Sequence, residues 1–176
     1  MNARHVILVG LPGAGKSTVG PLVAAALGRP FLDFDVELER RAGASVPEQF
    51  ARDGEAAFRA READLSRGLV DGPAMVLAPG GGWLANEAAS APLRPRGRII
   101  YLRTSPAAAL ARLGAGVTDR PLLAAADDPL AALAGLLARR SAGYEAAGLT
   151  VDTDGLDPAG VADRVVQLVR SAEDDA

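Results

Sequence analysis

The chain has 176 residues, of which 49% are hydrophobic, and this length and composition suit one domain, residues 1–176, with a full core. It contains no cysteine, which excludes disulfides and thiolate metal sites, and its charges, net −3, are interspersed without a basic stripe, which argues against nucleic acid as a partner. The sequence has no signal-peptide pattern and no apolar run of spanning length, so we expect a cytoplasmic monomer that does not contact a membrane.

The first predicted strand, residues 4–10, is a short apolar run that leads into a glycine-rich segment. Residues 10–18 read GLPGAGKST and match the phosphate-binding loop pattern G-x-x-x-x-G-K-[ST] completely. The helix predicted from Lys16 to Leu27 would point its positive end at the bound phosphates. The sequence therefore predicts a protein that uses a nucleoside triphosphate.

The chemistry of this loop assigns roles to its residues. Lys16, the only lysine of the chain, would reach the β- and γ-phosphates of ATP, and Ser17 would place its hydroxyl on Mg²⁺. We expect ATP to be bound by consecutive residues of the loop, namely Gly13, Ala14, Gly15, Lys16, Ser17 and Thr18.

Further strands are predicted at residues 30–34, 74–78, 98–103 and 149–153, each followed by a helical or loop segment. This alternation is typical of an α/β fold in three layers, with helices on both faces of a parallel sheet. Because the carboxyl ends of such strands lie along one edge, we expect the ligands to bind there.

The connecting segments carry their own signals. Residues 45–48 read SVPE, which is typical of a capping box that opens a short helix, and residues 54–70 have the charge and length of a longer one. Residues 114–126 have no clear period, so we expect a mobile lid there. Two more helices are predicted, one over about 128–140 and one from residue 157 onward.

Two carboxylates stand at the end of the second predicted strand. Asp33 and Asp35 would share one face of that strand, where such a pair could hold Mg²⁺ through water and orient or deprotonate an attacking hydroxyl. Alternatively, the pair is a polar strand end that caps the next helix. Arg59 and Glu62 also allow two interpretations. They form a surface ion pair, or Glu62 holds Arg59 in place to bind a carboxylate through two hydrogen bonds.

A triple glycine, Gly80, Gly81 and Gly82, follows the third predicted strand. A loose turn needs one glycine, whereas three indicate backbone N–H groups that approach a substrate or phosphate. The turn is therefore predicted to form part of a ligand site.

Taken in order, these motifs resemble the shikimate kinase family. The phosphate loop is followed by D-x-D at residues 33–35, F-x-x-D-G-E at 50–55, F-R-x-x-E at 58–62, G-G-G at 80–82 and R-P-L-L at 120–123. Each motif is weak alone, but the ordered set is specific within the nucleoside monophosphate kinase-like group. The resemblance is close over the first part of the chain and looser over the remainder.

The resemblance implies transfer of the γ-phosphate of ATP, with Mg²⁺, to the 3-hydroxyl of shikimate in aromatic amino-acid biosynthesis. It also implies a five-stranded parallel sheet, a helical substrate-binding region at about residues 34–62 and a lid at about 114–126. In such an enzyme the carboxylate of Asp35 contacts the reacting hydroxyl, while Arg120 and Lys16 contact the phosphate that is transferred.

The remaining roles implied by the resemblance concern binding. Arg112 and Pro158 fall where the family holds adenine, and Arg120 also contacts ATP. The residues that would contact shikimate are Asp35, Arg59, Gly80, Gly81, Gly82 and Arg140. Asp33, with Ser17, completes the expected metal site.

Three features depart from the family pattern, and two other functions stay open. Residues 155–157 read GLD and lack the arginine that some members of the family place near adenine, so the nucleotide preference is expected to be less strict. Phe34, inside the D-x-D motif, can fill the core, while Trp83 after the glycine turn is either a core anchor or a residue that narrows the substrate pocket. One alternative function is a kinase for gluconate or an aminated shikimate analogue. The other is a nucleotide-binding module without catalysis, against which the complete set of charged site residues argues.

Overall fold

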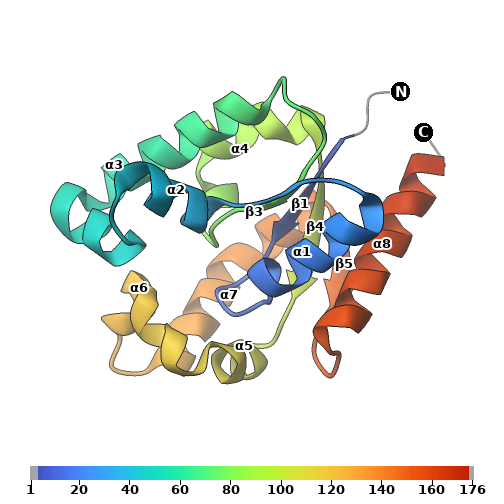
Figure 1. Ribbon diagram of the computed structural model, residues 1–176. Helices are drawn as coiled ribbons and strands as arrows, with labels where there is room; N and C mark the ends of the chain where they lie inside the picture. Colours follow the sequence, from blue (N-terminus) through green and yellow to red (C-terminus); the bar gives the residue numbers. More distant parts are fainter. Residues whose placement is uncertain (1–3, 175–176) are drawn as a thin grey trace.

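The computed structural model describes residues 4–174 and contains a five-stranded sheet in the order β2-β3-β1-β4-β5. Every pair of neighbouring strands is parallel, so the carboxyl ends all point to one edge, as predicted (Figure 1). The strands are β1 (His5–Val9), β2 (Phe31–Asp33), β3 (Val76–Ala78), β4 (Gly97–Arg103) and β5 (Leu149–Asp152).

Helices connect the strands and cover both faces of the sheet. They are α1 (Lys16–Leu27), α2 (Phe34–Ala42), α3 (Val46–Leu69), α4 (Glu87–Leu93), α5 (Pro106–Leu113), α6 (Pro121–Ala124), α7 (Pro129–Ala147) and α8 (Pro158–Asp174). Short 3₁₀ turns add η1 (Trp83–Ala85), η2 (Arg94–Arg96) and η3 (Gly114–Asp119). Within the part of the chain described, no helix combines the length and apolar character that crossing a membrane requires.

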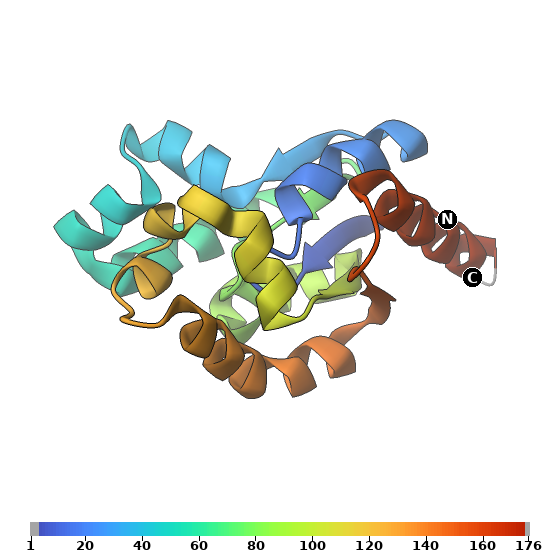
Figure 2. The same cartoon turned by 90° about the horizontal axis from the view of Figure 1, so that it is seen from below.

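The alternation of side chains along the central strand β1 divides the core in two. Val6 and Leu8 pack toward α1 and α8, which lie side by side in Figure 2. Ile7 and Val9 point to the opposite face and pack against residues of α2, α3 and α4. Because both faces of β1 are buried, the strand is apolar throughout, which is why its sequence reads as an unbroken hydrophobic run.

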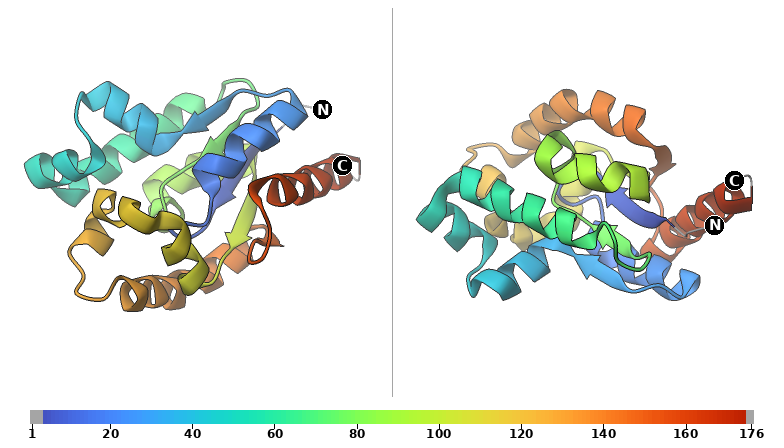
Figure 3. Two further views of the ribbon diagram at one scale, coloured as in Figure 1. Left: turned by 60° about the horizontal axis from the view of Figure 1, so that its bottom comes forward. Right: turned by 90° about the horizontal axis from the view of Figure 1, so that it is seen from above.

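A third, smaller core lies beyond the carboxyl edge and joins the phosphate loop to the segment after β4, whose helices α5, α6 and α7 lie together in the left-hand view of Figure 3. Leu123 of α6 packs there with Leu133 and Leu136 of α7. Residues 114–126, which have no clear period and were expected to form a lid, contain η3 and α6, and Leu123 anchors α6 to this apolar cluster.

The helices between β2 and β3 follow the sequence signals with one adjustment. Ser45 and Glu48 form the predicted capping box. The two helices expected around residues 45–70 form the single element α3, which is broken at Gly54, where φ is 82° and ψ is 168°. Near the other end of the chain, α7 extends to Ala147, well beyond the predicted end at about Arg140.

Candidate active site

The phosphate loop joins β1 to α1 and presents its backbone to an open cavity. Gly13 and Gly15 have φ values of 82° and 96°, in the left-handed region that favours glycine. Gly15 is also the N-cap of α1 and has no side chain to satisfy the first N–H groups of the helix, which remain available to an anion. The loop therefore has the backbone geometry of a phosphate site.

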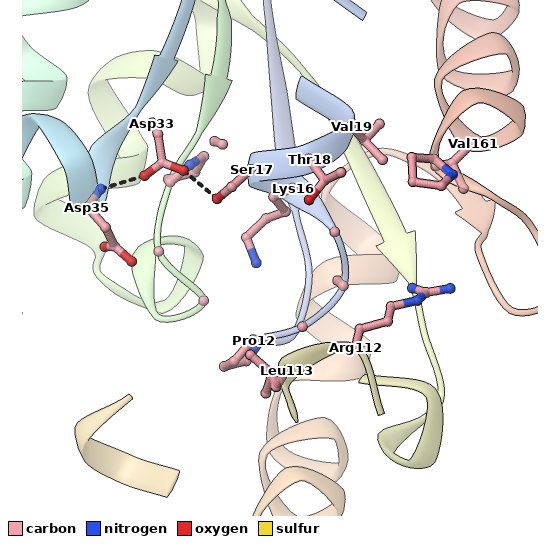
Figure 4. Close-up of a pocket in the computed structure, with 18 of the residues that line it drawn as sticks. Pro12, Lys16, Ser17, Thr18, Val19, Asp33, Asp35, Arg112, Leu113 and Val161 are labelled. Carbon is pink, nitrogen blue, oxygen red and sulfur yellow. Dashed lines mark hydrogen bonds between the residues drawn. The ribbon is translucent and has the colours of Figure 1, made fainter. Parts of the chain in front are cut away.

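Lys16 lies at the start of α1, and its side chain reaches back across the loop (Figure 4). Its Nζ donates hydrogen bonds to the carbonyl oxygens of Gly10 and Leu11, both at 2.9 Å. The residue is only 9% exposed, and burial, helped by the nearby positive charge of Arg120, lowers the pKa of Lys16 to about 8. Nearby anionic phosphates would reverse this effect, because they stabilise the ammonium form.

Asp33 links the end of β2 to the phosphate loop. One carboxylate oxygen, Oδ1, accepts hydrogen bonds from the backbone N–H groups of Asp35 (2.9 Å) and Val36 (3.3 Å), while Oδ2 accepts a hydrogen bond from the Ser17 hydroxyl. Asp33 is thus the N-cap of α2, and Asp35 already lies within that helix. The expectation that Asp33 and Asp35 share a strand face is wrong, because capping ends the strand between them.

The contact between Ser17 and Asp33 suits a magnesium ion. It brings a hydroxyl and a carboxylate oxygen together at the mouth of the phosphate loop, and hard oxygen ligands are those that Mg²⁺ prefers. No group of three or more acidic, histidine or cysteine side chains suited to a metal occurs within residues 4–174. This fits Mg²⁺, which usually takes one or two protein ligands and completes its shell with phosphate oxygens and water.

Asp35 meets an arginine from the distant segment that was predicted to form a lid. Nη1 of Arg120, which lies between η3 and α6, donates to Oδ2 of Asp35 at 2.6 Å. Among the described residues, no group donates to the second oxygen, Oδ1. Asp35 can therefore hold the lid arginine with one oxygen and accept a ligand hydroxyl with the other.

Arg59 is fixed by a partly buried network on α3. Its Nη1 donates to Oε2 of Glu62 at 3.1 Å, and Glu55 accepts from its Nε and Nη2 at 3.3 and 3.2 Å. Glu62 is only 1% exposed, and burial raises the pKa of its carboxyl. The surface-pair alternative is therefore wrong, and the arrangement matches an arginine held in position by Glu62.

Asn86, which the sequence did not single out, completes this network. Its Nδ2 donates to Oε2 of Glu62 and to the backbone carbonyl of Arg59, both at 3.1 Å. Asn86 follows η1 and belongs to no sequence motif, so only the fold brings it to Arg59.

Each glycine of the triple-glycine turn faces a different side chain. A Cβ on Gly80 would lie 3.5 Å from Oδ1 of Asp35, which is an ordinary contact, and a Cβ on Gly81 would lie 3.3 Å from Nη1 of Arg140, which is tight. A Cβ on Gly82 would overlap Nη2 of Arg59 at 2.5 Å. Close packing of the site side chains thus requires glycine at position 82 and favours it at 81, but does not require it at 80.

Helix α7 brings two side chains to the middle of this turn. The Gly81 carbonyl oxygen accepts hydrogen bonds from Nη1 of Arg140 (2.9 Å) and from the hydroxyl of Tyr144 (2.7 Å). Tyr144 is buried and stacks on Tyr101 of β4, with ring centroids 4.9 Å apart. Tyr144 was not predicted as a site residue, and its only sequence signal is its spacing of one helical turn from Arg140.

Arg112 and Pro158 lie at the far end of the cavity from Asp35. The side chain of Arg112 donates from Nη1 to Oγ1 of Thr153 (2.9 Å) and from Nη2 to its carbonyl oxygen (2.8 Å), which fixes the guanidinium plane. Figure 4 shows Arg112 and Asp35 on opposite sides of the phosphate loop. Thr153 is a further residue that the sequence did not indicate.

Two cavities meet at the ion pair of Asp35 and Arg120. The larger, of about 440 Å³, contains the phosphate loop and extends to Arg112 and Pro158. The smaller, of about 80 Å³, is lined by Arg59, Arg140, the three glycines and apolar residues of α3 and α6. Asp35 and Arg120 line both cavities, and so do Pro12, Gly80 and Gly81.

All predicted site residues thus line one of these two cavities, but the two aromatic departures do not. Trp83 is fully buried, and its Nε1 donates to the hydroxyl of Ser66 at 3.0 Å. Phe34 is also fully buried and packs edge-on against Trp83, with ring centroids 6.5 Å apart. Both are core residues, so Trp83 does not narrow the smaller cavity.

Comparison with known proteins gives a consistent result. The sequence model of the shikimate kinase family matches residues 12–170. A shikimate kinase of a Synechococcus species is 41% identical over 167 residues, which are 95% of this chain and 85% of the relative, and that of Chromohalobacter salexigens is 42% identical over 170 residues, or 96% and 93%.

Solved structures agree. The shikimate kinase of Acinetobacter baumannii in complex with shikimate has a TM-score of 0.91 and 37% identity, covering 97% of this chain and 94% of that one. A gluconokinase from Sinorhizobium meliloti has a TM-score of 0.60 but only 15% identity, so it shows a shared fold alone.

Proposed function

This chain belongs to the shikimate kinase family, and we propose that it transfers the γ-phosphate of ATP to the 3-hydroxyl of shikimate through the residues described above. The observation that carries the assignment of residues is the shared wall of the two cavities. Nucleotide phosphates in the larger cavity and a hydroxyl in the smaller one would meet at Asp35 and Arg120. Residues 1–176 act as one kinase domain, with 34–62 as the substrate-binding region and 114–126 as the lid.

The phosphates bind to the loop backbone and to Lys16. ATP occupies the larger cavity, with its adenine between Arg112 and Pro158, which both line that cavity. The hydrogen bonds of Arg112 to Thr153 support this assignment, because they fix the guanidinium group in place. The loop residues from Gly13 to Thr18 surround the phosphates. Lys16 exchanges its two carbonyl partners for phosphate oxygens, because an ammonium binds an anion more strongly than a neutral carbonyl.

Mg²⁺, held by Ser17 and through water by Asp33, would neutralise charge on the β- and γ-phosphates. The contact between these two side chains supports that assignment. Asp33 also begins α2, so the same carboxylate sets the position of Asp35 relative to the metal site.

The acceptor hydroxyl is oriented by Asp35 and attacks the γ-phosphorus. The free Oδ1 of Asp35 accepts the hydrogen bond of the 3-hydroxyl and directs its lone pair toward the phosphate. Charge that develops on the transferring group is stabilised by Lys16 and Arg120. Because Arg120 belongs to the lid, the site is complete only when that segment is closed, which limits transfer to water.

Shikimate is a carboxylate with three hydroxyl groups, and the smaller cavity matches that chemistry. Arg59 and Arg140 supply two guanidinium groups for the carboxylate, and each is already oriented by hydrogen bonds. Pre-orientation reduces the side-chain entropy lost on binding.

A coupled assay of ADP release tests the proposal with shikimate, quinate, gluconate and nucleoside monophosphates as acceptors. We expect shikimate to stimulate ADP release more than the other acceptors do. If gluconate is the best acceptor, the assignment of shikimate as the substrate is wrong. Arg59→Ala should raise the KM for shikimate about tenfold or more, because a charge-assisted contact is worth about 1.5–3 kcal/mol. The matched control is Arg61→Ala, on the same helix but paired with Asp53 outside both cavities.

Two further variants test the roles of Gly82 and Arg120. Gly82→Ala should also raise the KM for shikimate, because its Cβ would displace the guanidinium group of Arg59 from its network with Glu62. Arg120→Ala should lower kcat with nucleotide affinity largely kept. Unchanged kcat in Arg120→Ala would contradict the role given to the lid.

A further inference from the structure

A second cleft, of about 510 Å³, lies behind the triple-glycine turn. Helix α7 passes η1 and β4 on this side of the molecule (right-hand view of Figure 3). The cleft is hollow because its walls are built from small residues, which are Gly81, Ala85, Gly97, Gly143, Ala146 and Ala147. It shares only Gly81 and Arg140 with the two cavities of the active site.

The lining of this cleft carries positive charge alone. Arg94, Arg139 and Arg140 contribute guanidinium groups, and no lining residue is acidic. Arg94 pairs with Glu87 at its outer end, at 3.2 Å, whereas no hydrogen bond or ion pair engages the Arg139 side chain within residues 4–174. The floor includes Leu84 and Ile99, both buried and apolar.

We propose that this cleft is a binding site for a small organic anion, in particular a carboxylate on a flat apolar body. The volume falls within the range of small-molecule sites, about 300–1,000 Å³. Guanidinium groups bind carboxylates through two parallel hydrogen bonds, and the apolar floor accommodates a planar ring. The charges of Arg139 and Arg140, which no carboxylate pairs with among the described residues, select an anion over a neutral or cationic ligand of the same shape.

The cleft is coupled to the substrate cavity through Arg140. This side chain lines both spaces, and its position depends on the Gly81 carbonyl, which Tyr144 also binds. A carboxylate in the cleft attracts the Arg140 guanidinium away from the substrate side. The ligand therefore raises the KM for shikimate without lowering kcat, an effect that rests on the proposed role of Arg140.

The test uses naphthalene-2-carboxylate as the probe and naphthalene-2-carboxamide as its neutral counterpart. Binding is measured by calorimetry and by backbone amide shifts of the wild-type protein, with shikimate and ADP saturating the active site. Because the coupling is reciprocal, shikimate should weaken the binding of the probe without abolishing it. Gly143→Leu fills the cleft at a helical position where an added Cβ meets nothing within 4 Å. Gly68→Leu is its control, on an equally open position of α3. Arg139→Ala removes the unpaired cation, and Arg164→Ala on α8 is its control.

We expect one naphthalene-2-carboxylate to bind per chain and to shift the amide signals of Gly97 and Ala146. Binding should be at least ~tenfold weaker for the carboxamide and for the variants Gly143→Leu and Arg139→Ala. The two control variants should bind the probe as the wild type does. The probe should raise the KM for shikimate in the wild type but not in Gly143→Leu. Equal binding to Gly143→Leu, equal binding of the amide, or no saturable binding would overturn the proposal. Amide shifts report the cleft even if shikimate is not phosphorylated, so failure of the proposed function would be seen separately.

Discussion

The depressed pKa of Lys16 makes nucleotide binding depend on pH in a defined way. In the free protein the pKa falls from 10.5 to about 8, chiefly through burial and next through the charge of Arg120. This is a loss of about 3 kcal/mol in the stability of the ammonium form relative to water, at about 1.36 kcal/mol per unit. Bound phosphates restore the ammonium form, because they supply the anion that the empty loop lacks.

The expected size of the effect follows from the pKa of about 8. Binding of a nonhydrolysable ATP analogue should take up about 0.5 proton at pH 8 and about 0.1 at pH 7, because those are the fractions of neutral Lys16 in the free protein. Affinity should fall about tenfold between pH 7 and pH 9, since the deprotonated form must first bind a proton. The fall is in this direction because the free protein has the lower pKa.

The chain is well suited to measuring this titration. Lys16 is its only lysine, so protein labelled with ¹³C-lysine gives a single Cε resonance whose pH dependence reports the pKa directly. Calorimetry in buffers of different ionisation enthalpy gives the proton uptake. Lys16→Met, which retains the N-terminal amine, is the control and should show no uptake at pH 8. A free-protein pKa above 10, or uptake unchanged in Lys16→Met, would refute the reasoning.

Three more predictions concern stability, measured by urea unfolding. Gly20→Ala in α1 should destabilise the protein by about 1–3 kcal/mol, because its Cβ would lie 2.1 Å from the ring of Phe31 at the start of β2. Gly68→Ala, with no neighbour within 4 Å, should instead stabilise α3 by about 0.5–1 kcal/mol, and equal effects would contradict the steric argument. Burial lowers the pKa of His5, so its neutral form stabilises the fold above about pH 6.5, and this contribution is lost as the pH falls below that value. His5→Gln should therefore show a smaller loss between pH 7 and pH 5 than the wild type. Ser66→Ala should cost about 1–3 kcal/mol, because the buried indole N–H of Trp83 loses its acceptor, and a smaller cost in Trp83→Phe/Ser66→Ala relative to Trp83→Phe would support that cause.

The positions of the strands and the phosphate-loop geometry could be predicted because local sequence determines them. A buried parallel strand reads as an apolar run, and the glycines of the loop permit conformations closed to other residues. Element ends were harder to predict. The residues next to Asp33 in the sequence are compatible with either a strand or a helix cap. Only the hydrogen bonds that its carboxylate accepts from the backbone N–H groups of Asp35 and Val36 show that it is a cap.

The parts of the site that escaped prediction depend on contacts between distant segments. Asn86 holds Glu62 across 24 residues, and Thr153 holds Arg112 across 41. The order of residues 114–126 likewise comes from packing against α7. Such contacts leave no periodic signal, whereas arginines and glycines that face a ligand belong to motifs that can be read from sequence.

The difference between arginine and lysine accounts for how this site uses its charges. Arg59, Arg112 and Arg140 each have their guanidinium groups fixed by neighbouring oxygens. Lys16 is bound only to neutral carbonyls, and burial, followed by the charge of Arg120, lowers its pKa, while Asp35 and Asp33 oppose this shift. A bound phosphate would supply the anionic partner that Lys16 lacks in the free protein. Arg120 differs from the other arginines because its partner is the carboxylate that must receive the hydroxyl. In the proposed mechanism, Arg120 would therefore connect the two sides of the reaction, since it would orient Asp35 toward the acceptor and add charge where the phosphate is transferred.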